Sequence, residues 1–393
     1  MKVLIVGAGI AGTTLAYWLQ RAGYEPTIVE RAPALRTGGY IVDFWGAGFD
    51  VADKMGIAQE LLRRGYHLKE VRQVDDRGRR ITAFDPELFV RGTGGRYVSI
   101  ARSELAATIY DALGGRVETI FGDSVRALDD DGTRVRVTFE SGKVRDFDLV
   151  IGADGLHSQV RRLTFGPEED FEKYLGITVA AFDLEGYRPR DELVAVMHTK
   201  VGYQVTRLSL RDDRTMFLFT FVDDGSVPMH DAAAQQGAIR DRLAGATWEI
   251  PAILERMGDA GTFYCDRVSQ IHMPSWTRGR VALLGDAAAC VSLLAGQGSA
   301  LAMVEAYVLA SELAQAGGNH TEAFARYEKS LMPFLRSKQK AAVRLAPAFA
   351  PRGGMQLFMR NSIMKLFSVP FVARLAMGNS LRDAIELPSP PAV

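Results

Sequence analysis

The chain has 393 residues, of which 47% are hydrophobic and 24% charged, and its 47 basic residues balance its 47 acidic ones. This length exceeds what one simple core needs and predicts two or three structural units in a globular protein. The zero formal net charge argues against a nucleic-acid partner, and two cysteines, Cys265 and Cys290, are too few for a disulfide framework or a cysteine metal cluster.

Other features narrow the setting of the protein. No run of 18 apolar residues occurs, so we expect no membrane-spanning helix. The first motif begins at the N-terminus with no signal peptide before it, and low cysteine use fits a reducing compartment. The sequence therefore predicts a cytoplasmic protein. The six histidines lack the spacing of metal ligands, so we predict no metal site.

The first thirty residues predict a strand, a glycine-rich turn, a helix and a second strand. Residues 2–6 are apolar and rich in β-branched side chains, which favours a buried parallel strand. Residues 13–22 carry apolar side chains at helical spacing, and residues 26–29 form a strand that ends at Glu30. This order is typical of the βαβ unit of dinucleotide-binding folds.

The turn between these elements has the pattern Gly7-x-Gly9-x-x-Gly12. Gly7 permits a tight turn, Gly9 lets the backbone approach a pyrophosphate, and Gly12 lets the helix pack on the strand. The helix N-terminus offers free N–H groups to phosphates, and Glu30 is spaced to hold a ribose diol. The alternative is a glycine-rich turn in an ordinary α/β domain. The predicted nucleotide-binding residues are Gly7, Gly9, Ile10, Ala11, Gly12 and Glu30.

The rest of the chain predicts a second sheet inserted into the first domain. A hairpin is indicated at residues 68–75 and 80–84, and strands are predicted at 177–184, 193–199, 202–210 and 215–222. Buried parallel strands are indicated again at residues 149–152 and 281–284. A long apolar helix follows at 298–315, and the tail from residue 330 onward is mostly helical.

Four motifs in order resemble one family. They are GAGIAG with Glu30 and Arg31; Arg102 in ARSEL; Gly152-Ala153-Asp154-Gly155; and Gly285-Asp286-Ala287-Ala288 with Ala295-Gly296-Gln297-Gly298. Together they resemble the single-component FAD-dependent aromatic hydroxylases, which include para-hydroxybenzoate hydroxylase. The nearest likeness is to the tetracycline-modifying and polyketide-tailoring monooxygenases.

The resemblance implies a fold with three parts. It is an α/β fold with a Rossmann-like FAD-binding domain, an inserted antiparallel-sheet substrate domain and a C-terminal helical segment. We place the discontinuous FAD-binding domain at residues 1–75, 99–170 and 265–329. The substrate domain takes residues 76–98 and 171–264, and the helical segment takes residues 330–393.

The resemblance also implies roles in FAD binding. Asp286 would accept a hydrogen bond from a ribityl hydroxyl, although it could instead cap a helix. The Gly296–Gly298 loop would stabilise negative charge on the reduced flavin. The further residues assigned to FAD on this basis are Arg31, Gly39, Asp43, Arg102, Asp154, Gly155, Gly285, Asp286, Gly296, Gln297 and Gly298.

The inserted sheet should supply the substrate wall. Phe217, Phe219 and Phe221 alternate and so share one face, which could be either a pocket or plain core. An apolar, aromatic-lined cleft would suit a phenolic or polycyclic ligand. The substrate candidates are Phe182, Met197, Tyr203, Gln204, Arg207, Phe217, Phe219 and Phe221.

The implied reaction is hydroxylation of an aromatic or polyketide-like small molecule with NAD(P)H and O₂ through a flavin C4a-hydroperoxide. We assign no catalytic side chain, because the cofactor supplies the reactive atom. NAD(P)H would bind transiently. Two positions depart from the family: Ala289 stands where a histidine is frequent, and Leu293 where a proline is frequent. A same-fold reductase or dehydrogenase acting on a prenyl or lipid chain and a non-catalytic FAD-holding ligand-binding protein remain alternatives.

The tail is basic, and its role is open. Residues 331–393 carry nine lysines and arginines against two acids, Asp383 and Glu386. With the apolar runs at 356–359 and 363–367, this composition allows an interfacial amphipathic helix. We favour instead a helix docked across the two domains with its cations in water. The sequence does not fix the oligomeric state, which is a monomer or a homodimer.

Overall fold

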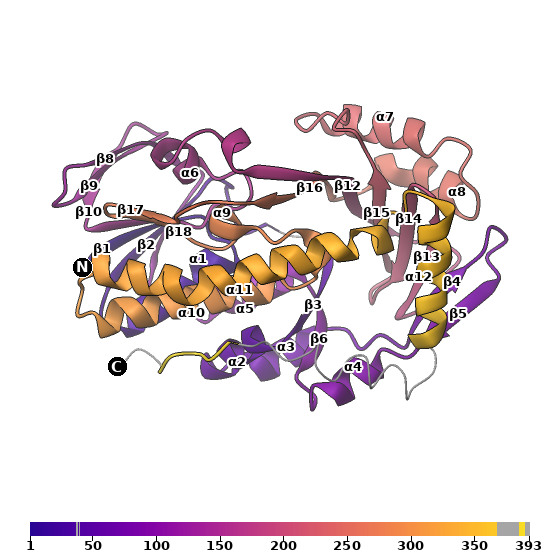
Figure 1. The fold of residues 1–393 in the computed structure, drawn as a ribbon, viewed down its shortest axis with the longest axis horizontal. Helices are drawn as coiled ribbons and strands as arrows, with labels where there is room; N and C mark the ends of the chain where they lie inside the picture. The colour runs from indigo at the N-terminus through magenta and orange to yellow at the C-terminus, as the bar shows by residue number, and fades with distance from the viewer. Residues whose placement is uncertain (37, 39, 368–384, 390–393) are drawn as a thin grey trace.

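A computed structural model describes residues 1–36, 38, 40–367 and 385–389. Figure 1 shows a β-sheet toward each end of the molecule, with the long helix α11 (His320–Phe349) reaching from one sheet toward the other. The predicted α/β fold class is confirmed. None of the described helices is long and apolar enough to cross a bilayer.

The first sheet has the parallel core that the N-terminal motif predicts. Its strands lie in the order β17 (Thr277–Arg278), β18 (Val281–Leu283), β11 (Leu149–Gly152), β1 (Lys2–Val6), β2 (Glu25–Glu30) and β7 (Glu118–Phe121). Val3 of β1 lies opposite both Leu149 and Pro26 in parallel register. Residues 3–5 are fully buried because both faces of the sheet are covered.

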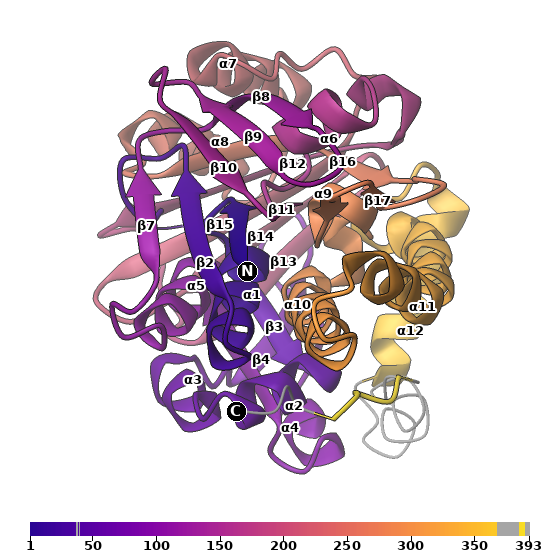
Figure 2. The ribbon, with the colours of Figure 1, turned by 90° about the vertical axis from the view of Figure 1, so that its left-hand side faces the viewer.

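Two layers cover this sheet. Figure 2 shows a three-stranded sheet on one face and helices on the other. The small sheet is formed by β8 (Val125–Asp130), β9 (Val135–Phe139) and β10 (Val144–Phe147), and the helices are α1 (Ile10–Arg21), α5 (Arg102–Asp111) and α10 (Gly298–Gln315).

The second sheet joins strands that are far apart in the sequence. Its order is β16 (Phe263–Ile271), β12 (Glu172–Glu185), β15 (Arg214–Val222), β14 (Tyr203–Ser209), β13 (Val194–Lys200), β4 (Glu70–Val74) and β5 (Arg80–Phe84). The predicted strands and hairpin are confirmed. However, β4 and most of β16 fall within segments that we assigned to the FAD-binding domain. They pair with β13 and β12, so the chain crosses between domains inside these strands. The division into domains stays a prediction.

Smaller elements complete the body. They are the pair β3 (Ile41–Trp45) and β6 (Tyr97–Ala101), the helices α2 (Ala47–Lys54), α3 (Ala58–Arg64), α4 (Glu87–Gly92), α6 (Gln159–Thr164), α7 (Ala232–Arg242), α8 (Ile250–Arg256), α9 (Asp286–Ala289) and α12 (Gly354–Phe367), and the 3₁₀ turns η1 (Glu168–Asp170), η2 (Met257–Asp259) and η3 (Leu293–Ala295).

From residue 330 to residue 367 the tail is mostly helical, as predicted. One face of α12 docks on the second sheet, and the other presents an apolar stripe to solvent. The exposed residues of this stripe are Met355, Phe358, Met359, Ile363 and Leu366. Arg374 and Arg382 lie outside the described residues, so the structure leaves the membrane interpretation of the tail a prediction.

Candidate functional site

Three parallel strands of the first sheet end at one edge and bring three of the sequence motifs together. β1 leads into Gly7, β11 into Asp154, and β18 into Asp286. Backbone hydrogen bonds keep the ends of neighbouring strands level with one another. Ala153 N donates to Val6 O at 2.8 Å, and Leu284 N donates to Gly152 O at 2.9 Å. Ligands of open α/β sheets bind beyond the carboxyl ends of the strands, which makes this edge the candidate site.

The three glycines of the turn meet different surroundings. A Cβ placed on Gly7 would lie 2.5 Å from Ala153 O, and one on Gly12 would lie 2.0 Å from Gly7 O. Both positions therefore exclude any side chain. A Cβ on Gly9 would meet no described atom within 4 Å. The space in front of Gly9 is open where the motif places a pyrophosphate, so this turn fits the predicted cofactor.

Glu30 lies at the end of β2 and faces the same turn. Its carboxylate accepts hydrogen bonds from Ala8 N and Ala32 N, both at 2.9 Å. These two bonds fix the carboxylate against the glycine-rich turn. A carboxylate has about four acceptor positions, so two remain for a ribose diol.

At the end of β18, Asp286 lies near a cluster of polar side chains. Arg102 interacts electrostatically with Asp286 and with two tyrosines, Tyr40 and Tyr264. The two tyrosine rings lie 5.8 Å apart, and Arg102 N donates to Tyr40 O at 3.2 Å. This cluster joins the β3–β6 pair, α9 and the start of β16.

The accessibility of this cluster shows that it lines a cleft. Tyr264 keeps 37% of its accessible surface, yet burial raises its pKa well above its usual value. Arg102 is also exposed although protein surrounds it closely. Tyr264 and Arg102 are thus open to solvent although protein lies close around them, as side chains that line a cleft are.

Asp286 does not act as a helix cap. It is the first residue of the four-residue helix α9, whose N-cap is Gly285, and no side chain caps that end. The alternative role that the sequence left open for Asp286 is therefore not observed. Asp286 stays the candidate for the ribityl chain.

Glu305 is a buried residue that sequence analysis missed. It projects from α10, accepts a hydrogen bond from Gly285 N at 2.8 Å and another from Tyr327 Oη at 3.4 Å, and so braces the turn before Asp286. Burial raises the pKa of Glu305 to about 8. The only sequence signal was an acidic residue in the middle of a mostly apolar helix.

We expect Glu305 to make the folded protein less stable as pH rises. The folded-state pKa of about 8 lies above the unfolded value of 4.5. Between these values the unfolded chain gives up its proton while the folded chain keeps it, so stability falls with rising pH. From pH 5.5 to 8 the loss is at most about 3 kcal/mol. The Glu305→Gln variant should not show this loss of stability between pH 5.5 and pH 8. Urea unfolding of both proteins at equal FAD saturation tests this, and parallel pH profiles would contradict it.

The Gly296–Gly298 loop lies between η3 and the N-terminus of α10. Gly296 has a left-handed φ of 64°, and an added Cβ would come 3.9 Å from the indole of Trp45. Gln297 is buried and accepts a hydrogen bond from Lys338 Nζ of α11 at 2.8 Å. The loop thus lies between Trp45 on one side and Lys338 on the other. The backbone amides at the start of α10 follow it directly.

The other predicted FAD residues are placed in different ways. The Asp154 carboxylate accepts bonds from Ser158 Oγ at 2.5 Å and Gln159 N at 2.7 Å, so it caps the turn into α6, although its backbone adjoins Gly7. Asp43 accepts bonds from two hydroxyls of β6. Arg31 is exposed beside Glu140. Gly39 lies outside the described residues. Flavin contact by these residues and by Gly155 stays a prediction.

The two faces of the second sheet separate the substrate candidates. Strand register puts Phe182 opposite Phe217 and Arg207 opposite Phe217, so all three share one face. That face packs against α7 and α8. The candidates that lie on it are Phe182, Tyr203, Arg207, Phe217, Phe219 and Phe221. Phe217, Phe219 and Phe221 are fully buried there, so the structure favours the alternative that they belong to the core. We therefore do not include this face of the sheet in the proposed substrate site.

Met197 and Gln204 lie on the opposite face. Gln204 pairs with Thr220 and Thr199, and Met197 pairs with Thr206. This face turns toward α12 and the end of α11, because Thr220 Oγ1 donates to Phe349 O and Gln204 accepts a bond from Arg360. The structure therefore brings two of the eight candidates to the side where the two sheets and the tail meet.

Comparison with known proteins decides the family. A family described as an FAD binding domain matches residues 1–336. This chain belongs to that family of flavin-dependent monooxygenases. The monooxygenase is an oxidoreductase that binds FAD, as the family resemblance implied.

The likeness extends over the whole chain. A flavin-dependent monooxygenase of Legionella longbeachae is 33% identical over 99% of this chain and 98% of its own. An uncharacterized protein of Mycobacterium tuberculosis is 39% identical over 89% of this chain and 95% of its own. The crystal structure of tetracycline destructase Tet(51) has a TM-score of 0.85 and 33% identity and covers 99% of both chains.

Arg360 of the monooxygenase is a second residue that sequence analysis missed. It is 7% exposed and donates to Gln204 at 2.6 Å, to Gln73 at 2.5 Å and to Ala348 O at 2.7 Å. Burial lowers the pKa of Arg360 to about 10. We expected the cations of the tail to lie in water. Arg360 instead links α12 to the second sheet through hydrogen bonds to two of its strands. Its position in a basic segment of the sequence did not indicate that it is buried.

Proposed function

We propose that this monooxygenase uses NAD(P)H and O₂ to hydroxylate an aromatic or polyketide-like small molecule in the cytoplasm. The observation that carries the proposal is the strand-end edge where the open Gly9 position, Glu30 and Asp286 come together, with Arg102 interacting with Asp286. The likeness to a tetracycline destructase over 99% of both chains supports a tetracycline-like, polyketide substrate.

The side chains of the cleft would hold the cofactor along its length. The turn amides and Glu30 would bind the adenosine half, and Asp286 would accept a hydrogen bond from the ribityl chain. The α10 amides after Gly296 would stabilise negative charge at the ring. When bound, FAD supplies the redox chemistry and the activation of oxygen.

The substrate would lie between this cleft and the second sheet. Tyr40 and Tyr264 offer aromatic surface beside Asp286, and Met197 and Gln204 lie on the face of the sheet that meets the tail. Arg360 fixes the amide oxygen of Gln204. This arrangement combines apolar contact area with a few fixed polar groups, as small-molecule sites do.

We expect a ligand that occupies this site to accelerate NAD(P)H oxidation by the FAD-loaded protein. A panel of phenols and polyketides is screened for this acceleration, and active compounds are incubated under ¹⁸O₂. Incorporation of one ¹⁸O atom into the product supports hydroxylation. Acceleration without ¹⁸O in any product would contradict the proposal and favour a reductase. No acceleration by any compound would favour a ligand-binding protein.

One observation favours a reductase that acts on a prenyl or lipid chain. The apolar stripe of α12 is solvent-exposed, with Phe358 at 69% and Met355 at 73%. Such a stripe next to Lys365 suits contact with a lipid surface. Under this second proposal, prenyl substrates should be reduced at the expense of NAD(P)H, with no oxygen incorporated.

A further inference from the structure

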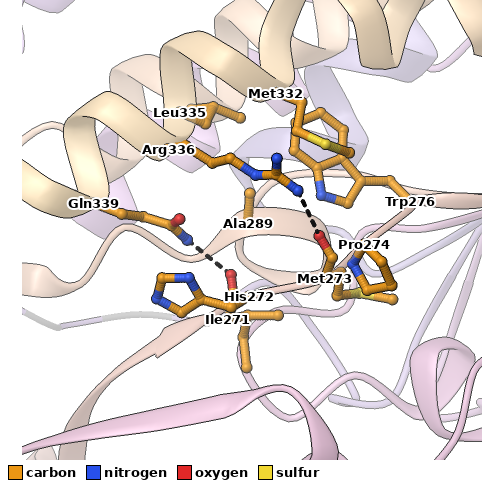
Figure 3. A pocket seen from close by; sticks show the side chains of 10 residues that line it. All are labelled: Ile271, His272, Met273, Pro274, Trp276, Ala289, Met332, Leu335, Arg336 and Gln339. Atoms are coloured by element: carbon orange, nitrogen blue, oxygen red, sulfur yellow. Dashed lines mark hydrogen bonds between the residues drawn. The ribbon is translucent and has the colours of Figure 1, made fainter.

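A cavity of about 330 Å³ lies apart from the predicted cofactor and substrate residues. It opens between α11, the segment after β16 and α9, as Figure 3 shows. Its lining residues are Ile271, His272, Met273, Pro274, Trp276, Ala289, Met332, Leu335, Arg336 and Gln339. No residue that we assign to FAD or to substrate is among them, and the volume falls within the range of small-molecule sites.

The walls of this cavity are firm and largely apolar. Ile271, Trp276 and Leu335 are at most 2% exposed, and Met273 is 5% exposed. Gln339 ties α11 to the opposite wall, because its Nε2 donates to Ile271 O at 2.7 Å. The cavity is therefore bounded by side chains that the core already holds in place, so a ligand would meet a preformed surface.

Positive charge collects at the edge of the cavity. Arg336 makes one long hydrogen bond, 3.4 Å from Met273 O, and forms no ion pair with any residue that the structure describes. Burial and the nearby charges of Lys173 and Arg336 lower the pKa of His272. Arg336 therefore places a positive charge at the rim of the cavity.

The neighbouring carboxylates are engaged elsewhere. Glu328 accepts hydrogen bonds from Ser275 Oγ at 2.7 Å and from Trp276 N at 2.5 Å. Glu172 accepts one from Ser269 Oγ at 2.5 Å. The Arg336 guanidinium is thus left with most of its N–H groups free beside an apolar cavity.

We propose that this cavity binds a small carboxylic acid with an apolar body. The carboxylate would pair with Arg336, whose planar N–H groups match two carboxylate oxygens. The apolar body would lie against Met332 and Pro274, the apolar lining residues that keep accessible surface, where its removal from water favours binding. This site is independent of the monooxygenase reaction proposed above.

Calorimetric titration of the FAD-loaded protein tests the proposal with two probes of equal shape, 2-naphthoate and neutral 2-naphthamide. We expect 2-naphthoate to bind with a Kd of about 0.1–1 mM, the range for a ligand of this size, and the amide at least about ten-fold more weakly. Arg336→Gln should reduce naphthoate binding to the level of the amide. Arg344→Gln, on the same helix but outside the cavity, should leave it unchanged.

A second variant separates this cavity from the predicted substrate site, which could also accept an aromatic acid. Met332→Trp adds bulk to the cavity wall and should abolish binding of both probes, with the melting temperature as the check on folding. Naphthoate binding that survives both Arg336→Gln and Met332→Trp would place the ligand elsewhere and overturn the proposal. Failure of 2-naphthoate to bind the wild-type protein would overturn it as well.

Discussion

Gly9→Val should yield a folded protein that retains no FAD. The backbone at Gly9 has a φ of −76°, which any residue can adopt, and an added Cβ would meet no described atom within 4 Å. The apoprotein should therefore fold, with a melting temperature close to that of wild-type apoprotein. The branched side chain would occupy the space where the pyrophosphate approaches the turn. Visible absorbance of the purified protein and release of flavin on denaturation measure the effect.

Gly12→Ala is the comparison variant, because it also adds a side chain to a glycine of this motif but at a position with no room for one. The added Cβ would lie 2.0 Å from Gly7 O. That overlap is with backbone, so we expect Gly12→Ala to disrupt folding itself. Gly9 and Gly12 lie three residues apart in one motif, but their substitutions should have different effects. Gly9→Val should prevent FAD binding, and Gly12→Ala should prevent folding. A Gly9→Val protein that purifies yellow with bound FAD would show that the pyrophosphate does not lie at this turn.

Asp286→Ala should weaken FAD binding by about 10- to 150-fold. The Asp286 carboxylate caps no helix and faces the cleft near Arg102, so its removal leaves the fold in place. Loss of one hydrogen bond to a charged acceptor costs about 1.5–3 kcal/mol, which corresponds to this range in affinity. Titration of apoprotein with FAD, followed by flavin fluorescence, measures the change.

Asp231→Ala provides the comparison for this variant. Asp231 caps α7 by accepting hydrogen bonds from Ala233 N at 2.9 Å and Ala234 N at 3.2 Å. Its removal should lower the melting temperature and leave FAD affinity unchanged, because a helix cap contributes about 1 kcal/mol to stability alone. If Asp286→Ala behaved in the same way, Asp286 would be a structural residue and the ribityl contact would be disproved.

The N-terminal half of the candidate site could be predicted because its determinants are local. The apolar run of β1, the glycine spacing and the acid at the end of β2 all lie within thirty residues, and each limits the backbone directly. Gly7 and Gly12 are required by atoms of the same βαβ unit or of the strand beside it. Asp286 could be assigned only through a family resemblance, because its partners come from distant segments.

The faces of the second sheet required the tertiary structure. Alternation in the sequence correctly indicated that Phe217, Phe219 and Phe221 share a face, since side chains alternate along a strand. It could not say which face, because both sides of this sheet are covered. The packing of α7 and α8 turns the phenylalanines into the core and leaves Gln204 on the side of the tail.

Buried charges show the same limit of the sequence. Glu305 lies within an apolar helix, and Arg360 within a basic tail, so neither position distinguishes a solvated side chain from a buried one. Each is buried because other elements supply its hydrogen-bonding partners: Gly285 and Tyr327 for Glu305, and the glutamines of β4 and β14 for Arg360. The sequence by itself determined the fold class and the nucleotide-binding turn, whose interactions are short in range. The tertiary structure alone decided which side chains line the cleft and which lie in the core, because that choice depends on contacts between elements that are not adjacent in the sequence.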